Sequence, residues 1–216
     1  MSRPFSLFHL HNNLINTLSH TSAGMASLAF RLYLAPIFWM AGTSKLNAFD
    51  STVEWFGDTE WGLGLPFPWL MAVLATAAEL IGAILLALGL FTRLISLPLM
   101  VTMVIAIVFV HWDNGWQAIA DAKAPFANAQ VLAAPAKLER AREILQTHGD
   151  YEWLTASGKF VILNNGIEFA ATYLIMLLAL VGLGGGKYHS LDYWFGRVLE
   201  RKFPAINSAY PKALAN

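Results

Sequence analysis

Two long apolar runs of this chain each contain a single charged residue, and this feature restricts the possible fold most strongly. The run Ala23–Ala41 holds only Arg31, and the run Trp69–Leu90 holds only Glu79. A charge near the centre of a bilayer costs at least about 2.5–3.5 kcal/mol, so it usually faces a partner, a cavity or a transport path. The two runs therefore predict membrane spans that enclose a polar interior.

The composition agrees with a membrane protein. Of the 216 residues, 56% are hydrophobic and 13% are charged, whereas soluble domains average about 25% charged residues. The formal net charge is zero, with 14 basic and 14 acidic residues, so nothing indicates nucleic-acid binding. The sequence has no cysteine, which excludes a disulfide, a thiolate metal site or an iron–sulfur cluster within this chain.

Four segments approach the roughly 20 apolar residues that a helix needs to cross a bilayer. They lie at about 24–43, 68–90, 94–112 and 165–183. We expect an all-α fold, namely an integral membrane four-helix bundle formed by a single domain over residues 1–216. Basic residues near the span ends favour a multi-pass protein with both termini in the cytoplasm.

Two further helices are expected outside the bundle. The charges of Lys137–Leu145 recur at helical spacing between Pro135 and Gly149, which predicts a short helix within a long external loop, 113–164. The stretch Leu191–Phe203 alternates apolar and basic faces and predicts an interfacial C-terminal helix.

Arg31 and Glu79 fall near the midpoints of the first two spans, so we expect them to form an intramembrane polar pair. One interpretation is a structural ion pair that fixes how two helices rotate against each other. The other is a proton or ligand site inside the bundle. The turn between the second and third spans carries Arg93 on the cytoplasmic side.

A second group of polar residues is expected near the outer ends of the spans. Its members are Lys45, His111, Asn164, Asn165 and Glu168. Asn165 and Glu168 have the spacing of a helix cap with an acidic residue at its third position, so a capping role competes with a role in a site. His111 is either an interfacial anchor or a titrating or metal-binding group.

Other candidate sites are weaker. Met100 and Met103 lie one helical turn apart, and thioethers select Cu(I), but methionine in a span usually serves packing. The sequence shows no nucleophile–base arrangement and no glycine-rich phosphate loop before a helix. The apolar run Phe160–Leu163 before Asn164 suits a short re-entrant piece that leads into a broken helix.

Several of these residues also carry a family likeness. Arg31–Phe38 (RLYLAPIF), followed by Gly42–Leu46 (GTSKL), resembles the opening of DoxX family membrane proteins. Glu79–Arg93 (ELIGAILLALGLFTR) resembles their second-span signature, and a histidine that closes span three fits too. The family implies a four-helix inner-membrane protein associated with oxidative-stress, sulfur–quinone or copper-handling systems.

Four further motifs are similar to a DoxX branch called HvfX, which is encoded with the maturation machinery of copper-binding modified peptides. They are Trp55–Gly57, Trp61–Pro68, His111–Trp116 and Phe160–Phe169. The first hypothesis is therefore an accessory membrane subunit that docks such a peptide or its maturation enzymes through the outer loops and the tail Lys187–Asn216.

Two alternatives stay open. One is a membrane subunit of a quinone-linked oxidoreductase, in which a partner supplies the redox centre and Arg31, Glu79 and His111 manage protons. The other is a small transporter or exporter. The residues favour a non-catalytic subunit over an autonomous enzyme. They indicate no firm cofactor, and copper or quinone would be reached through partners.

Overall fold

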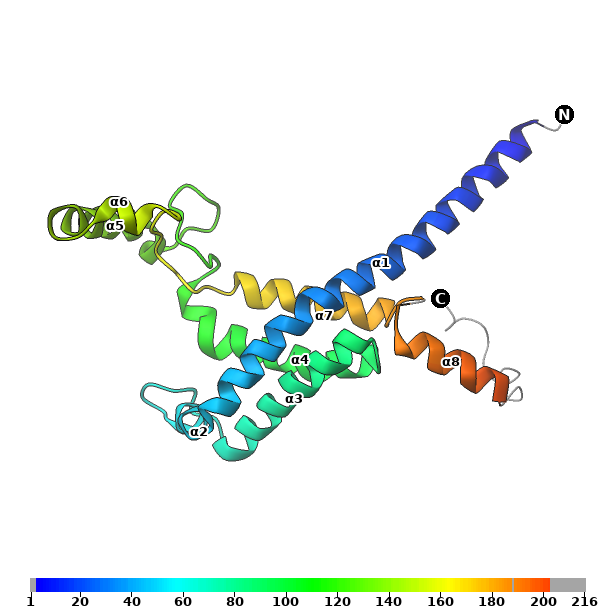
Figure 1. Ribbon diagram of the computed structural model, residues 1–216, viewed down its shortest axis with the longest axis horizontal. Coiled ribbons are helices and arrows are strands. Elements are labelled where there is room, and N and C mark those ends of the chain that lie inside the picture. Colours follow the sequence, from blue (N-terminus) through cyan, green and yellow to red (C-terminus); the bar gives the residue numbers. More distant parts are fainter. Residues whose placement is uncertain (1–2, 188, 203–216) are drawn as a thin grey trace. The chain divides into compact units, whose positions relative to one another are not determined.

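The computed structural model describes residues 3–187 and 189–202, and all regular elements in this part are helical (Figure 1). The α-helices are α1 (Arg3–Asn47), α2 (Phe49–Gly57), α3 (Pro68–Leu88), α4 (Thr92–Ile105), α5 (Ala129–His148), α6 (Tyr151–Thr155), α7 (Glu168–Leu183) and α8 (Leu191–Lys202). A π-helix, Ala106–His111, and a 3-10 turn, Trp112–Asn114, continue α4. The chain forms two compact units, residues 1–100 with 175–216 and residues 101–174.

Among the residues that the structure describes, three helical segments are long and apolar enough to cross a membrane. They are Thr21–Asn47, Pro68–Leu88 and Thr92–Asn114. These bounds contain or closely follow the first three expected spans, so the prediction of an all-helical chain with long apolar helices is confirmed. The fourth apolar helix, α7, has 16 residues, which amounts to about 24 Å at 1.5 Å per residue.

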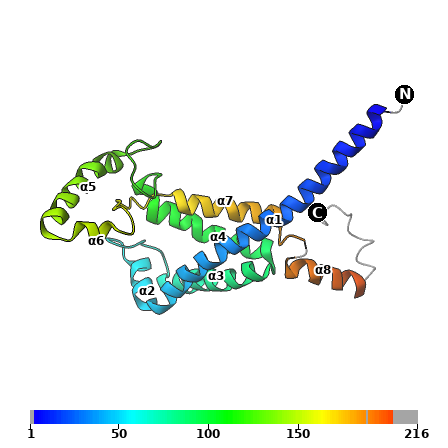
Figure 2. The same ribbon diagram turned by 45° about the horizontal axis from the view of Figure 1, so that its top comes forward.

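In the first unit, α1 and α3 run side by side in opposite directions, with α2 next to the start of α3 (Figures 1 and 2). Gly42 permits this close approach, because a Cβ there would lie 2.8 Å from Cγ of Leu80. Small residues at such contacts let membrane helices pack by van der Waals attraction. The buried side chains of this unit include Leu34, Phe38, Leu86, Leu99, Leu177 and Leu180.

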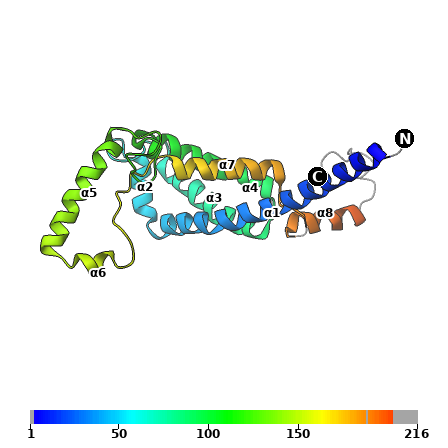
Figure 3. The ribbon, with the colours of Figure 1, turned by 90° about the horizontal axis from the view of Figure 1, so that it is seen from above.

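The second unit contains a longer outer helix than expected. The helix α5 begins after Asn128, whose side chain accepts a hydrogen bond from the Val131 N–H at 3.0 Å, and ends before Gly149. Asparagine is a strong N-cap, and Pro135 lies inside the helix instead of at its start. The short helix α6 follows α5 after a tight turn (Figure 3).

Two extended stretches of the second unit pair with each other. The N–H of Ala120 donates to the Ile162 carbonyl at 3.0 Å, and the Asn164 N–H donates to the Ala118 carbonyl at 2.9 Å. A single antiparallel bridge joins Ile119 and Leu163. The segment expected as a re-entrant piece, Phe160–Leu163, is extended chain whose Ile162 carbonyl and Leu163 pair with Ala120 and Ile119. The tail segment 203–216, part of the expected docking surface, lies outside the described residues.

Candidate functional site

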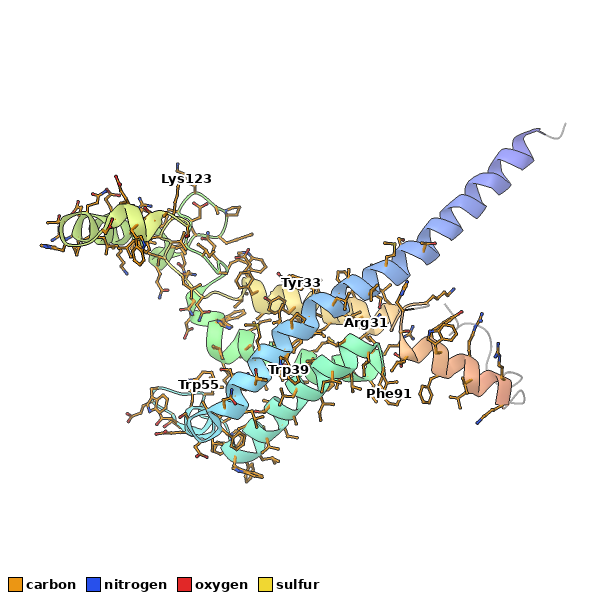
Figure 4. All side chains as sticks on the ribbon, viewed as in Figure 1. Arg31, Tyr33, Trp39, Trp55, Phe91 and Lys123 are labelled. Atoms are coloured by element: carbon orange, nitrogen blue, oxygen red, sulfur yellow. The ribbon has the colours of Figure 1, made fainter. Side chains whose placement is uncertain are left out.

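Arg31 is fully buried on α1, and its guanidinium binds a carbonyl at the end of another helix (Figure 4). Its Nη1 donates to the carbonyl of Leu86 at 3.1 Å, and its Nη2 donates to the carbonyl of His189 at 2.8 Å. Leu86 lies in the last turn of α3, where carbonyls lack partners within the helix and the helix dipole favours a cation. Arg31 is therefore bound by a helix terminus.

The turn between α3 and α4 is shaped to receive this guanidinium. Gly89 ends α3 with a left-handed φ of 64°, and a Cβ at this position would collide with Nη1 of Arg31. Asp192, in the first turn of α8, accepts from the N–H of Phe91 at 2.7 Å and from the N–H of Thr92 at 3.0 Å. Its carboxylate thus caps the start of α4, where negative charge is favourable.

Two further side chains bind carbonyls at the end of α7. Ser27 Oγ donates to the Gly184 carbonyl at 2.6 Å, and Arg93 Nη2 donates to the Gly182 carbonyl at 3.1 Å. We call Ser27, Arg31, Gly89, Arg93 and Asp192 the Arg31 hub. The hub ties α1, the α3–α4 turn, the end of α7 and the start of α8 together through helix termini.

Glu79 has a different partner from the one expected. Lys45 Nζ lies 2.8 Å from both carboxylate oxygens of Glu79, and the two side chains are 25% and 5% exposed. The expected pairing of Arg31 with Glu79 is therefore wrong. Leu86, the Arg31 partner, lies two turns beyond Glu79 on α3, about 10 Å along the helix axis.

The register of the two helices explains this error. Gly42 of α1 lies against Leu80 of α3, and the two helices run in opposite directions. Arg31 precedes Gly42 by eleven residues, so its Cα lies about 16 Å along the helix axis from the level of Leu80. A depth estimate from the midpoints of the two apolar runs omits this register.

The second unit brings together most of the outer polar residues. His111 Nδ1 lies 2.9 Å from the carbonyl of Asn165, and Asn114 Nδ2 donates to the same carbonyl at 3.1 Å. A carbonyl only accepts, so Nδ1 of His111 carries the proton. Asn164 Nδ2 donates to the carbonyls of Asn114 and Gln117, at 2.7 and 2.8 Å.

Glu168 belongs to the same network. Its Oε2 accepts from the N–H of Ala118 at 2.9 Å, and α7 begins at Glu168 itself. Asn165, with a φ of 59°, is therefore not the residue that directly precedes the helix, and the expected cap at Asn165 is wrong. We call His111, Asn114, Asn164, Asn165 and Glu168 the outer polar cluster. Lys45 belongs to the first unit, where it binds Glu79.

The metal candidates are not strengthened. Within residues 3–187 and 189–202, no group of three or more histidine, aspartate or glutamate side chains is arranged to hold a metal ion. Met100 and Met103 are half-buried on α4.

The residues that sequence reasoning missed are Ser27, Gly89, Asn114, Gln117 and Asp192. Each acts through or beside backbone groups of a distant segment, such as Ser27 with Gly184 or Asp192 with Phe91. Asp192 alone carried a visible signal, an acidic residue at the start of an amphipathic stretch.

Comparison with known proteins assigns the chain to a family. The DoxX profile matches residues 26–112. Inner membrane protein YphA of Escherichia coli (strain K12) is 34% identical over 116 residues, which cover 51% of this chain and 78% of that protein. The chain belongs to the DoxX family. The segment matched by the DoxX profile contains Arg31, Lys45, Glu79, Arg93 and His111.

A second relative extends the comparison. Putative oxidoreductase CatD of Bacillus subtilis (strain 168) is 34% identical over 86 residues, which cover 40% of this chain and 60% of that protein. No solved structure matches the chain. The DoxX profile ends before Asn114, Asn164, Asn165 and Glu168, so four of the five residues of the outer polar cluster lie beyond the family match.

Proposed function

We propose that this DoxX family protein is a non-catalytic accessory subunit of the bacterial inner membrane, of the HvfX branch, that supports a copper-binding modified-peptide system. The observation that carries the proposal is the surface of the second unit. Phe126, Trp153, Val161 and Leu163 are 76%, 73%, 60% and 67% exposed there. Large exposed apolar side chains on a folded segment are typical of a surface that a partner covers.

The buried charges support an accessory role in a second way. Arg31 binds two carbonyls and Glu79 binds Lys45, so both charges have structural partners. Each charge is therefore held by the fold in a defined structural contact. The outer surface is therefore the better candidate for the functional contact.

The test is recovery of partners by the intact protein. Tagged full-length protein purified from membranes of copper-treated cells is expected to bring down peptide-maturation proteins, identified by mass spectrometry. Trp153→Ser should reduce this recovery severalfold, because it removes an exposed anchor. Trp61→Ser, which removes an exposed tryptophan of the first unit (57% exposed against 73% for Trp153), is the control. Absence of every maturation protein under copper stress would contradict the proposal.

A second candidate is a membrane subunit of a quinone-linked oxidoreductase, and two observations favour it. A relative carries the name putative oxidoreductase. An apolar groove of about 310 Å³ lies between α1 and α3 (Trp39 in Figure 4), and its wall residue Ala83 is one turn from Glu79. Its lining consists of Ala35, Pro36, Trp39, Met40, Ala83, Ile84 and Ala87.

Quinone chemistry makes a distinct prediction. If the groove holds a quinone, Glu79→Gln should reduce quinol-dependent electron flow in membranes, while Glu60→Gln in the exposed loop should not. Unchanged respiration and quinol oxidation in the Glu79→Gln membranes would remove the basis for this candidate.

We further propose a single membrane domain with four spans, both termini in the cytoplasm and α8 on the interface. The apolar character of α7 and the Tyr193, Trp194 and Arg197 side chains of α8 support this topology. The cysteine-free sequence allows a clean test with single substitutions. A membrane-impermeant maleimide should label Lys123→Cys in spheroplasts, and Lys202→Cys only after permeabilisation. The reverse pattern would invert the topology.

A further inference from the structure

The second unit contains a cavity of about 450 Å³, which shares only Phe126 with the proposed docking surface. Its walls include the aromatic residues Trp116, Phe126 and Phe169 and the acidic residues Asp121 and Glu168. The volume falls within the range of about 300–1,000 Å³ that is typical of small-molecule sites.

The aromatic walls are held in place by the backbone. The rings of Trp116 and Phe126 have centroids 6.0 Å apart and planes tilted by 59°. Phe126 adopts a left-handed φ of 63°, although its side chain is 76% exposed. Such a conformation is uncommon and strained for a bulky residue. The fold thus holds an exposed ring in a strained conformation beside the indole.

The charge of the cavity is negative. Neither Glu168 nor Asp121 takes part in an ion pair within the part of the chain that the structure describes. Glu168 Oε2 accepts from the Ala118 N–H, and Asp121 Oδ1 accepts from the Lys123 N–H at 2.9 Å. No lysine, arginine or histidine lines the cavity. The two carboxylates therefore lack a cationic partner at this site.

The floor of the cavity is preformed. Gln117 is 5% exposed, and its Nε2 donates to the carbonyls of Asp121 and Pro125 at 3.1 Å each. Its Oε1 accepts from the Asp121 N–H at 2.8 Å. One buried amide therefore closes the loop 117–125, and a ligand would bind without first having to order it.

We propose that this cavity binds an organic ammonium ion, with the cation against the aromatic rings and the Glu168 carboxylate as its counter-charge. Aromatic faces attract ammonium groups, most strongly where the site is desolvated. The ammonium group has two possible sources, a zwitterionic lipid headgroup or a soluble amine. Both present the same chemistry to the cavity.

The probe is choline, titrated calorimetrically into the full-length protein in nanodiscs of phosphatidylglycerol. The uncharged isostere 3,3-dimethylbutan-1-ol serves as its control. We expect choline to bind at least tenfold more tightly than the alcohol. Glu168→Gln keeps an acceptor for the Ala118 N–H and should weaken choline binding at least tenfold. Phe126→Gly relieves the backbone strain and should also weaken it, whereas Glu152→Gln, exposed on α6, should not.

A second arm separates the two sources. In nanodiscs of phosphatidylcholine, a headgroup ligand would compete and lower the apparent choline affinity, whereas a soluble-amine site would keep it unchanged. Either result supports the ammonium site and names its source. Equal binding of choline and its uncharged isostere would overturn the proposal. Absence of choline binding in phosphatidylglycerol nanodiscs, or full binding by both Glu168→Gln and Phe126→Gly, would overturn it too.

Discussion

Arg31 and Glu79 are both buried charges on long apolar helices, yet the fold stabilises them in different ways. Glu79 faces a formal charge, the Lys45 ammonium at 2.8 Å. Arg31 faces backbone carbonyls at the end of α3 and before α8. The comparison teaches that a lone charge in a span need not indicate an opposite charge on the neighbouring span, because a helix terminus supplies a fixed partial charge.

The largest expected effect comes from breaking the formal pair. Lys45→Met leaves the Glu79 carboxylate, 5% exposed, without its cation. Removal of one partner of a buried pair costs about 3–5 kcal/mol, and the partial exposure of Lys45 places this case near the lower end. The free energy of unfolding, measured by reversible unfolding in mixed micelles, should fall accordingly.

The double variant provides the control for this prediction. Lys45→Met with Glu79→Leu removes both charges and should recover most of the lost stability, because apolar replacement of a buried pair is often neutral. A double variant as unstable as Lys45→Met alone would show that the two charges are not coupled.

The next effect tests the Arg31 side of the comparison. Arg31→Lys keeps the charge but loses the planar fork that reaches the Leu86 and His189 carbonyls together. Loss of one charge-assisted hydrogen bond should lower the free energy of unfolding by about 1.5–3 kcal/mol. When Arg31→Lys is combined with Glu79→Gln, the two losses should add to within about 0.5 kcal/mol. A larger coupling energy would show that Arg31 and Glu79 interact, contrary to the contacts in the structure.

The sequence predicted the helices better than the contacts. Apolar runs report directly on helices that can cross a membrane, so the segments ending near Asn47, Leu88 and Asn114 were found. The burial of Arg31 and Glu79 was also predictable, because exposure of either charge to lipid is costly.

The partners of Arg31 were not predictable, because they are backbone atoms of distant segments. Nothing in the residue type of His189 or Gly184 marks its carbonyl as an acceptor for Arg31 or Ser27. The outer polar cluster was assembled partly correctly, since His111 and Asn165 do meet. The extended pairing of residues 160–166 with residues 115–120 could not be inferred, because neither stretch has a hydrophobic periodicity that marks a strand.

A smaller effect is expected at the turn that receives Arg31. Gly89→Ala places a Cβ against Nη1 of Arg31 at a left-handed φ of 64°, and should lower the free energy of unfolding by about 1–3 kcal/mol. Gly64→Ala is the matched control, since Gly64 also has a left-handed φ, 59°, but a Cβ there makes only ordinary contact with Cγ2 of Thr59 at 3.5 Å. If Gly89→Ala is no more destabilised than Gly64→Ala, the hub does not depend on close approach at Gly89.

The smallest effect concerns a carboxylate outside the spans, bound by backbone donors rather than by a cation. Asp58 Oδ1 accepts from the N–H groups of Trp61 at 2.9 Å and Glu60 at 2.7 Å, and these bonds lower the pKa of Asp58. Because the pKa is lower in the folded than in the unfolded protein, the Asp58 carboxylate stabilises the turn at pH values above its unfolded pKa of about 3.9. This contribution is lost as the pH falls through the lower folded pKa.

Amide hydrogen exchange of the turn tests this sign. At neutral pH, the Glu60 and Trp61 amides should exchange more slowly in the parent protein than in Asp58→Asn. The difference should shrink as the pH falls below about 4, because protonated Asp58 then resembles the amide. Titration of Glu79 is common to both proteins and cancels in the comparison. A difference that persists at the lowest pH would mean that the charge of the Asp58 carboxylate does not stabilise the turn. Arg31 would then be the remaining example of a charge stabilised by backbone groups rather than by an opposite ion.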